Sequence, residues 1–239
     1  MRAIICGANG AMGRILQDKL PGSIAGLVSL DGENGVPKTF RELGKCDCDA
    51  VIDFSHHSAV ADVLTFAKES GCGAVVCATG HTEEEKELIY AAAKEIPVFY
   101  SGNMSVGIAV LCTLAKEAAA AFPDADIEIV EVHHNRKVDA PSGTANMLFE
   151  AVKEVRPQAK KVCGRAGEGK RQKDDIGIQA LRMGNVVGIH EIHICTHSQT
   201  LTLRHEAHDR GMFADGAIKA AQFLCGKKPG LYTMKDLLK

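Results

Sequence analysis

A glycine-rich turn between a short apolar segment and a helical pattern limits the fold of this chain more than any other feature. Residues 2–6 form an apolar run that predicts a strand, and residues 12–20 show helical periodicity that a Pro-Gly pair ends. Between them, Gly7, Gly10 and Gly13 have the spacing G-x-x-G-x-x-G, which differs from the usual dinucleotide spacing G-x-G-x-x-G. The order of strand, glycine turn and helix predicts a phosphate-binding loop.

The next segment extends this prediction to a dinucleotide. Residues 24–30 form a second apolar strand that ends at Asp31. An acid about twenty residues after the glycine turn binds the adenosine ribose hydroxyls in folds of this type. The alternative is that residues 31–35 form only a turn.

Strand and helix patterns then alternate through the first hundred residues. Expected strands are residues 50–54, 73–78 and 97–100, and expected helices are residues 59–70 and the segment from Thr82 to Glu95. Repeated units of this kind predict an α/β fold with a Rossmann-like, doubly wound parallel sheet. Its ligand should lie beyond the carboxyl ends of the strands, where Thr79 and residues 101–103 stand.

The second half of the chain has a different pattern. After an alanine-rich helix over residues 104–122 we expect a strand at 127–132, a helix at 145–155 and β-rich segments at 176–182, 186–195 and 199–205. These patterns predict a second α+β domain with a mixed or antiparallel sheet. Residues 160–175 are basic and contain glycine, so we expect a mobile loop there, and residues 212–224 are helical again.

Chemistry-bearing residues are concentrated in residues 131–145. Two histidines, two cations, a carboxylate and a Ser-Gly-Thr turn follow the strand at 127–132. The turn precedes a helix, so its backbone N–H groups and the helix dipole favour an anion, such as a carboxylate or phosphate. Lys137 and Arg136 add positive charge, and His133 can exchange protons near neutral pH. The alternative is an ordinary capped helix after a solvated loop.

Residues 133–145, with the sequence HHNRKVDAPSGTA, resemble the signature of the dihydrodipicolinate reductase family, also called 4-hydroxy-tetrahydrodipicolinate reductase. The resemblance continues along most of the chain, through residues 7–13, 53–55, 78–80, 103–107, 182–188 and 210–216. It implies an enzyme of diaminopimelate and lysine biosynthesis. That enzyme reduces 4-hydroxy-tetrahydrodipicolinate, or the dihydrodipicolinate formed by loss of water, to tetrahydrodipicolinate with hydride from NADH or NADPH.

The resemblance also implies roles for particular residues. His133 would be the acid/base residue and Lys137 the proton donor, while His134, Gly143 and Thr144 would bind a carboxylate of the small cyclic substrate. The implied cofactor-binding residues are Gly7, Ala8, Asn9, Gly10, Ala11, Met12, Asp31, Cys77, Ala78, Thr79, Ser101, Gly102, Asn103 and Met104. Cys77 and Ala78 replace the more usual Gly-Thr, and Arg182 and Arg210 could be further charge partners or structural ion pairs.

We expect a dinucleotide-binding domain at 1–104 and 211–239, and a substrate-binding and oligomerisation domain at 105–210, with the boundaries placed from the resemblance. A homotetramer is implied by the resemblance. The residues give an indirect signal as well: Ile189, Ile192, Ile194, Leu201 and Leu203 make the second sheet so apolar that one of its faces should need a partner.

NADH is expected to be preferred over NADPH. Asp31 can accept hydrogen bonds from both ribose hydroxyls, but its charge repels a 2′-phosphate. The next residue is Gly32, where family members that use NADP well tend to have an arginine. Lys38 and Arg41 lie near enough in sequence to bind a phosphate and allow use of both cofactors.

Composition and charge exclude several classes of protein. A net charge of -2 gives no field that would recruit nucleic acid, and 46% apolar residues is typical of a soluble globular chain. Residues 1–6 enter a strand directly and no apolar run has membrane length, so we expect a cytoplasmic protein with no membrane partner.

The nine cysteines predict neither a disulfide framework nor a metal site. Their number is odd and most lie in apolar segments, as buried thiols do in reduced proteins. Cys46 and Cys48 are too close in sequence for a usual zinc pair, and His205 and His208 lack the spacing of a zinc helix.

Two other functions remain open at this stage. Another two-domain oxidoreductase of amino-acid metabolism, such as an aspartate or semialdehyde dehydrogenase, would not explain the turn at residues 137–144. A regulatory module that senses nicotinamide would ordinarily carry a DNA- or partner-binding appendage, and no such segment is recognisable.

Overall fold

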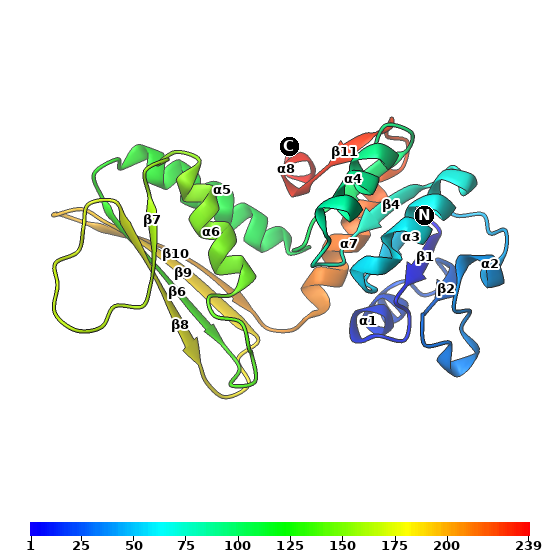
Figure 1. The fold of residues 1–239 in the computed structure, drawn as a ribbon, viewed down its shortest axis with the longest axis horizontal. Coiled ribbons are helices and arrows are strands. Elements are labelled where there is room, and N and C mark those ends of the chain that lie inside the picture. The colour runs from blue at the N-terminus through cyan, green and yellow to red at the C-terminus, as the bar shows by residue number, and fades with distance from the viewer. The chain divides into compact units, whose positions relative to one another are not determined.

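The computed structural model describes residues 1–239, and the chain divides into two compact units (Figure 1). One comprises Met1–Val106 and Gly211–Lys239, and the other comprises Gly107–Arg210. Each unit contains its own sheet. No helix has the length and apolar character needed to cross a membrane.

The first unit contains a six-stranded sheet in which every neighbouring pair is parallel. Its strands are β1 Ala3–Cys6, β2 Ile24–Val28, β3 Ala50–Asp53, β4 Gly73–Val76, β5 Pro97–Tyr100 and β11 Gly230–Tyr232, in the spatial order β11-β5-β4-β3-β1-β2. Its helices are α1 Ala11–Lys19, α2 Phe40–Leu43, α3 Val60–Ser70, α4 Glu83–Ala92, α7 Gly211–Leu224 and α8 Met234–Leu237, with short 3-10 turns η1 Glu33–Gly35 and η2 His57–Ala59. The predicted Rossmann-like parallel sheet is confirmed.

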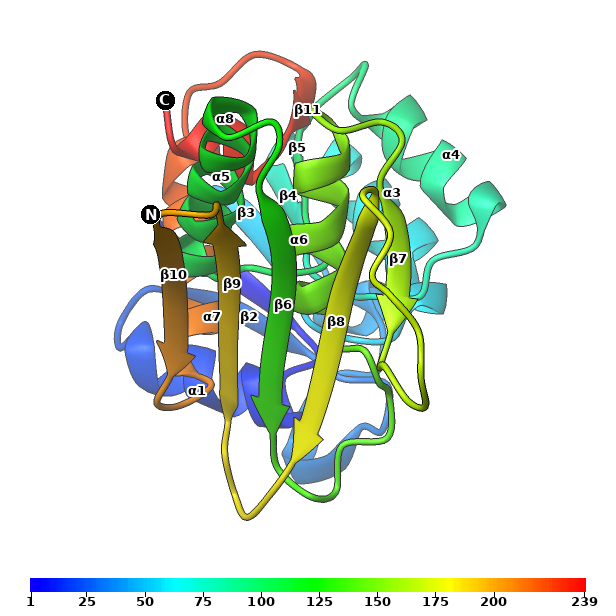
Figure 2. The same cartoon turned by 90° about the vertical axis from the view of Figure 1, so that its left-hand side faces the viewer.

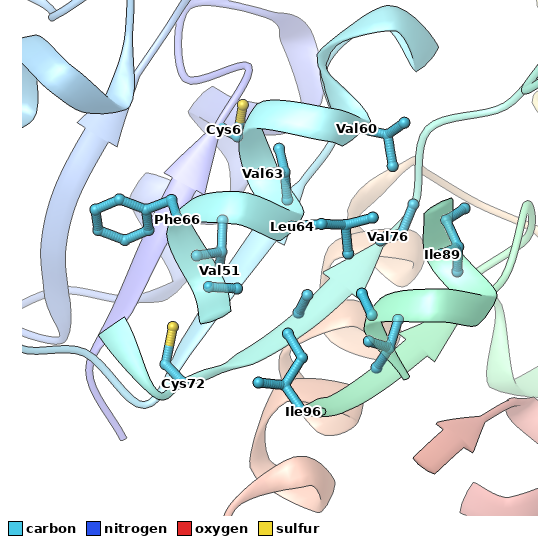
Figure 3. Packing of buried hydrophobic residues seen from close by; sticks show 14 of the residues in the cluster. Cys6, Val51, Val60, Val63, Leu64, Phe66, Cys72, Val76, Ile89 and Ile96 are labelled. Carbon is cyan, nitrogen blue, oxygen red and sulfur yellow. The ribbon is translucent and has the colours of Figure 1, made fainter. Parts of the chain in front are cut away.

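Helices cover both faces of this sheet. On one face, Val63 and Leu64 of α3 and Ile89 of α4 pack against strand residues such as Val51 and Val76 (Figure 3). Successive side chains of a strand point to opposite faces. Accordingly, on the other face, Phe99 of β5 meets Phe223 of α7 edge-on, at 6.3 Å between ring centroids. The chain therefore returns after the second unit to complete this sheet with α7 and β11.

The second unit contains a five-stranded mixed sheet (Figure 2). Its strands are β6 Asp126–His133, β7 Lys160–Cys163, β8 Asp175–Arg182, β9 Gly188–Cys195 and β10 Thr200–Ala207, in the order β10-β9-β6-β8-β7. β8 is parallel to β6 and β7, whereas β9 is antiparallel to β6 and β10. Helices α5 Val106–Ala121 and α6 Gly143–Lys153 lie on one face, and Figure 2 shows no helix of this unit over the other.

The apolar residues that predicted an uncovered sheet face lie mostly on the covered face, so that argument was wrong. Ile192 and Ile194 are buried in the core with α5 and α6, and Leu203 packs against it. Leu201 pairs with Ile194 and therefore shares its face, and only Ile189 lies on the other. Strand periodicity separates two faces of a sheet, but it does not tell which of them a helix covers.

The expected loop at residues 160–175 is also corrected. Lys160–Cys163 forms edge strand β7, which its polar composition concealed. Two arginines anchor the remaining segment: Arg165 contacts Glu128 and Asp175, and Arg171 contacts Asp126. No strand was expected in the C-terminal tail, but this segment forms strand β11 and helix α8.

Candidate active site

Strand β6 carries Glu131 and His133 on the face that α5 and α6 cover. Ile127 and Ile129 occupy the same face, because alternate residues of a strand point in the same direction. Glu131 has 0% of its surface exposed and His133 has 8%. A carboxylate and an imidazole thus continue the row of buried isoleucines to the end of the strand.

Glu131 accepts hydrogen bonds from several elements. Its Oε2 accepts from His133 Nδ1 at 2.5 Å and from Arg182 Nη1 at 2.8 Å. Its Oε1 accepts from Arg182 Nη2 at 2.8 Å and from the Ser142 backbone N–H at 3.0 Å. Burial raises the pKa of Glu131, but the hydrogen bonds from Arg182, His133 and Ser142 outweigh it, and the pKa lies below its usual value. We call Glu131, His133, Ser142 and Arg182 the Glu131 cluster.

Ser142 is the N-cap of α6 and connects the other members of the Glu131 cluster to His190. Its Oγ accepts from the Ala145 N–H at 3.2 Å, which caps the helix, and lies 3.0 Å from His190 Nε2. His190 is opposite Glu131 on β9, and its ring meets that of His133 edge-on at 5.1 Å. Burial, followed by the nearby His133, lowers the pKa of His190 to about 3, so this ring is neutral at physiological pH.

The N-terminus of α6 has the features of an anion site. Its first turn contains no acidic residue. Gly143 is exposed, and a Cβ there would meet nothing within 4 Å. The helix dipole and the N–H groups of this turn therefore favour a carboxylate near Gly143 and Thr144.

The loop between β6 and α6 holds Lys137. Its Nζ lies 2.7 Å from Asp139 Oδ1, and this contact holds the pKa of Asp139 below its usual value. Arg182 Nη2 donates to the Asp139 carbonyl at 2.6 Å, so the loop is tied to the Glu131 cluster. Burial, and then the positive charge of Arg136, lowers the pKa of His134, whose Nδ1 is buried without a protein partner.

In the first unit, the turn after β1 leaves no room for a side chain at Gly7 or at Gly13. Gly7 has a φ of 82°, and a Cβ on Gly13 would lie 2.2 Å from the Gly7 carbonyl oxygen. Helix α1 begins after Gly10, with no side-chain cap and no acid in its first turn. Its N–H groups are left to bind an anion, and the close turn fits the pyrophosphate of a dinucleotide.

Asp31 lies beside this turn. Its Oδ1 accepts from Asn9 Nδ2 at 2.6 Å, and this hydrogen bond, with the backbone N–H of Glu33, lowers the pKa of Asp31. The Lys38 side chain covers Gly32 so closely that a Cβ there would lie 2.4 Å from Lys38 Cε. Arg41 instead lines a separate groove between α2 and α3.

The other candidate cofactor residues follow β4 and β5. Thr79 and Gly102 are exposed, whereas Cys77, Ala78 and Met104 are at most 5% exposed. Burial raises the pKa of the Cys77 thiol well above its usual value. These buried residues could reach a ligand only through their backbone.

The structure brings His133, Ser142 and the Lys137 loop together around a carboxylate that the sequence interpretation did not single out. The sequence signal for Glu131 was a break in the alternation of the strand. The first acids of the strand lie on the face opposite Ile127 and Ile129, whereas Glu131 lies on the same face as these isoleucines. Arg182, one of the two arginines left open, forms an ion pair with Glu131. No cluster of three or more His, Cys, Asp or Glu side chains has the geometry to hold a metal ion.

Comparisons with known proteins show the family of this chain. The model of the C-terminal part of dihydrodipicolinate reductase matches residues 107–238, and that of the N-terminal part matches residues 17–104. The chain belongs to the dihydrodipicolinate reductase family. As a member of the family it is an oxidoreductase.

Full-length relatives named 4-hydroxy-tetrahydrodipicolinate reductase include one from Caldanaerobacter subterraneus subsp. tengcongensis, 43% identical over 100% of this chain and 98% of the relative. Another, from Caulobacter vibrioides, is 42% identical over 100% of this chain and 97% of the relative. The dihydrodipicolinate reductase of Paenisporosarcina sp. TG-14, solved with dipicolinate bound, has a TM-score of 0.81 at 24% identity, covering 98% of this chain and 97% of that one. An aspartate dehydrogenase from Thermotoga maritima has a TM-score of 0.53 at 12% identity over 95% of this chain and 98% of that one, which shows a shared fold alone.

Proposed function

We propose that this chain reduces 4-hydroxy-tetrahydrodipicolinate, or the dihydrodipicolinate formed by loss of water, to tetrahydrodipicolinate in diaminopimelate and lysine biosynthesis. The observation that carries the proposal is the Glu131 cluster, which places His133 beside a helix N-terminus suited to a carboxylate, with Lys137 in the adjoining loop. The family relatives named for this activity align over the whole chain.

The reaction needs a proton as well as a hydride. The nicotinamide cofactor supplies hydride to one carbon of the conjugated ring when bound, and the protein must deliver a proton to the neighbouring carbon. We assign acid/base work to His133, whose Nδ1 is occupied by Glu131 so that Nε2 remains for exchange. We assign proton delivery to Lys137, which must leave the ion pair with Asp139 to reach substrate.

The substrate carboxylates define the rest of the site. We place one carboxylate at the N-terminus of α6, where Gly143 and Thr144 would donate to it. His134 would contact a carboxylate as well. The lowered pKa of His134 means that this ring donates as a neutral imidazole near pH 7, through whichever nitrogen bears the proton.

The cofactor is proposed to be NADH in preference to NADPH. Its pyrophosphate would lie on the turn from Gly7 to Met12, and its adenosine ribose would meet Asp31, which Asn9 already orients. The nicotinamide end would meet Thr79 and residues 101–103, together with the backbone of Cys77, Ala78 and Met104. We also propose a cytoplasmic homotetramer, assembled through the sheet face of the second unit that no helix covers.

The test measures oxidation of NADH with the freshly formed condensation product of pyruvate and aspartate semialdehyde. We expect turnover by the wild type, and a loss of ~10²- to 10⁴-fold in kcat for His133→Ala and for Lys137→Ala. Matched controls are His193→Ala, on another strand of the same sheet, and Val138→Ala, which neighbours Lys137 and is 98% exposed.

Cofactor affinity, measured by NADH fluorescence titration, should be the same in all four variants. Turnover of aspartate with NAD instead of this substrate would favour an aspartate dehydrogenase. Wild-type rates in His133→Ala or Lys137→Ala would remove the assignment of that residue.

A further inference from the structure

The carboxylate of Glu131 has no solvent contact, yet its hydrogen-bond partners come from three separate segments. They are the end of β6 through His133, the end of β8 through Arg182, and the start of α6 through Ser142. The parallel register pairs His133 with Arg182, and the antiparallel register places His190 opposite Glu131. Sheet pairing therefore fixes the positions of these groups before any ligand binds.

An ionised carboxylate can only accept hydrogen bonds. Because the pKa of Glu131 lies below its usual value, the group is ionised near neutral pH, and the 2.5 Å contact requires His133 Nδ1 to bear a proton. The ring orientation and tautomer of His133 are then both fixed, and Nε2 is the atom left to exchange a proton with a ligand. Gly188 packs close to this atom, since a Cβ there would lie 3.1 Å from it.

The same carboxylate is connected to the other parts of the site. It accepts from the Ser142 N–H, in the turn that would bind a substrate carboxylate. Arg182 contacts Glu131 with both terminal nitrogens and also donates to the carbonyl of Asp139, whose side chain holds Lys137. A displacement of Glu131 would therefore move His133 and the Lys137 loop relative to the start of α6.

We propose that Glu131 is a positioning residue for the reaction: it holds His133 in the Nδ1–H tautomer with Nε2 presented to substrate, and Arg182 holds Glu131 in place. The inference rests on the proposed function for His133. Glu131 does not touch substrate in this proposal and acts only through His133. Arg182 serves the same end, by neutralising the buried carboxylate and fixing its plane.

A purely structural ion pair is the alternative, because removing one partner of a buried pair is destabilising whatever else it does. Stability alone therefore does not separate the two roles. The separating measurement is a double-mutant cycle, in which a residue that acts only through His133 has no further effect once His133 is absent.

The experiment compares Glu131→Gln in the wild-type and His133→Ala backgrounds. Glutamine keeps the size of the side chain but removes its charge and replaces one acceptor oxygen with a donor NH₂. We expect Glu131→Gln to lower kcat by about 10- to 100-fold, which is part of the ~10²- to 10⁴-fold that a positioned proton-transfer group contributes. In the His133→Ala background the same change should lower kcat by less than about 2-fold, equivalent to a coupling of at least ~1 kcal/mol.

The matched control is Glu128→Gln, on the same strand but the opposite face, where Glu128 pairs with Arg165. It should leave kcat unchanged. The KM for NADH should be the same in every variant. Equal effects of Glu131→Gln in the two backgrounds, or no effect in the wild-type background, would overturn the proposal while leaving the assigned reaction intact.

If Glu131→Gln does not fold, a second variant and a second measurement still test the proposal. Arg182→Lys keeps the positive charge but loses the bidentate contact with Glu131. It should lower kcat by about 3- to 10-fold only when His133 is present. The ¹⁵N chemical shifts of His133 in the neutral ring should report Nδ1–H in the wild type and a mixture of tautomers in Glu131→Gln or Arg182→Lys.

The tautomer measurement needs no turnover. If the wild type does not reduce the substrate, the proposed function fails, and the spectra still decide whether Glu131 fixes the ring. A wild-type ring protonated on Nε2 alone would overturn the positioning role directly.

Discussion

His190 is 4% exposed, and its ring contributes a pH dependence to folding that can be assigned to one residue. Its pKa falls from the ordinary 6.5 to about 3 in the folded state. The unfolded chain therefore binds a proton between these values that the folded chain does not, and stability must fall as pH decreases through this range. Between pH 7 and pH 5 the loss should be ~2 kcal/mol.

His190→Gln should remove most of this loss, since glutamine can still bond to Ser142 but does not titrate. Urea denaturation at pH 7 and pH 5 measures it, as the difference in unfolding free energy for each variant. His193→Gln, on the same strand but partly exposed, is the control and should keep the wild-type difference. An unchanged pH difference in His190→Gln would mean that another group causes the acid sensitivity.

Lys38 is the residue through which a 2′-phosphate could be accepted. The methylene groups of Lys38 lie over Gly32, the residue that follows Asp31 in sequence, and the charge of Asp31 would repel the phosphate. We expect wild-type kcat/KM to favour NADH by ~10-fold, about 1.4 kcal/mol, as for one partly screened repulsion. Lys38→Ala should widen this ratio by a further ~5-fold, because an exposed charge contact contributes about 1 kcal/mol.

The measurement is kcat/KM for both cofactors at saturating substrate. Arg41→Ala should leave the ratio unchanged, because Arg41 lines the groove between α2 and α3 instead. A preference for NADPH in the wild type would show that the charge of Asp31 does not decide the choice.

For single residues, local sequence patterns indicated the groups with recognisable chemistry but not the groups that position them. His133, Lys137 and the Ser-Gly-Thr turn stand in one contiguous motif. Glu131 looked like one of several acids on a half-buried strand, and its contact with Arg182 joins residues 51 apart in sequence. Such a pair depends on the register of β6 and β8, which no local pattern specifies.

Among the elements, α7 is fixed within the first unit by a glycine. A Cβ on Gly216 would lie 1.7 Å from the carbonyl oxygen of Met104, so the helix backbone itself contacts the segment before α5. Gly216→Ala must displace one of them, and overpacking of this kind costs about 1–3 kcal/mol or more.

Urea denaturation should show a lower midpoint for Gly216→Ala with an unchanged slope. Gly169→Ala is the matched control, because a Cβ there meets nothing within 4 Å, and its effect should stay within about 0.5 kcal/mol. A Gly216→Ala midpoint equal to that of wild type would show that α7 can shift at little cost.

The elements with strong periodicity were predicted within a few residues, and the short polar ones were not. β1 and α1 follow directly from an apolar run, a glycine turn and a helical pattern. β7 has four residues, three of them exposed, and exists because it pairs with β8 at the edge of the sheet. Tertiary pairing, rather than local preference, forms a strand of this kind.

The proposed homotetramer would assemble through the face of the second sheet that α5 and α6 do not cover. The face is mixed in character: Val130, Val132 and Ile189 are partly buried, and Glu191 forms an ion pair with Arg204 at 3.1 Å. An interface here would bury an apolar centre beside charged pairs, as protein interfaces commonly do.

Val132→Glu tests this assembly. Val132 pairs with Ile189 in the antiparallel register, so the substitution puts a carboxylate at the centre of the apolar part of the face. Burying an unpaired charge is costly, and the proposed tetramer should dissociate into smaller species at micromolar concentration while each chain stays folded. Multi-angle light scattering measures the mass, and circular dichroism confirms the fold.

Val138→Glu, in a loop where the side chain is 98% exposed, should remain tetrameric. A wild-type mass equal to one chain of 25.5 kDa would contradict the tetramer. A tetramer that survives Val132→Glu would instead place the interface on another surface.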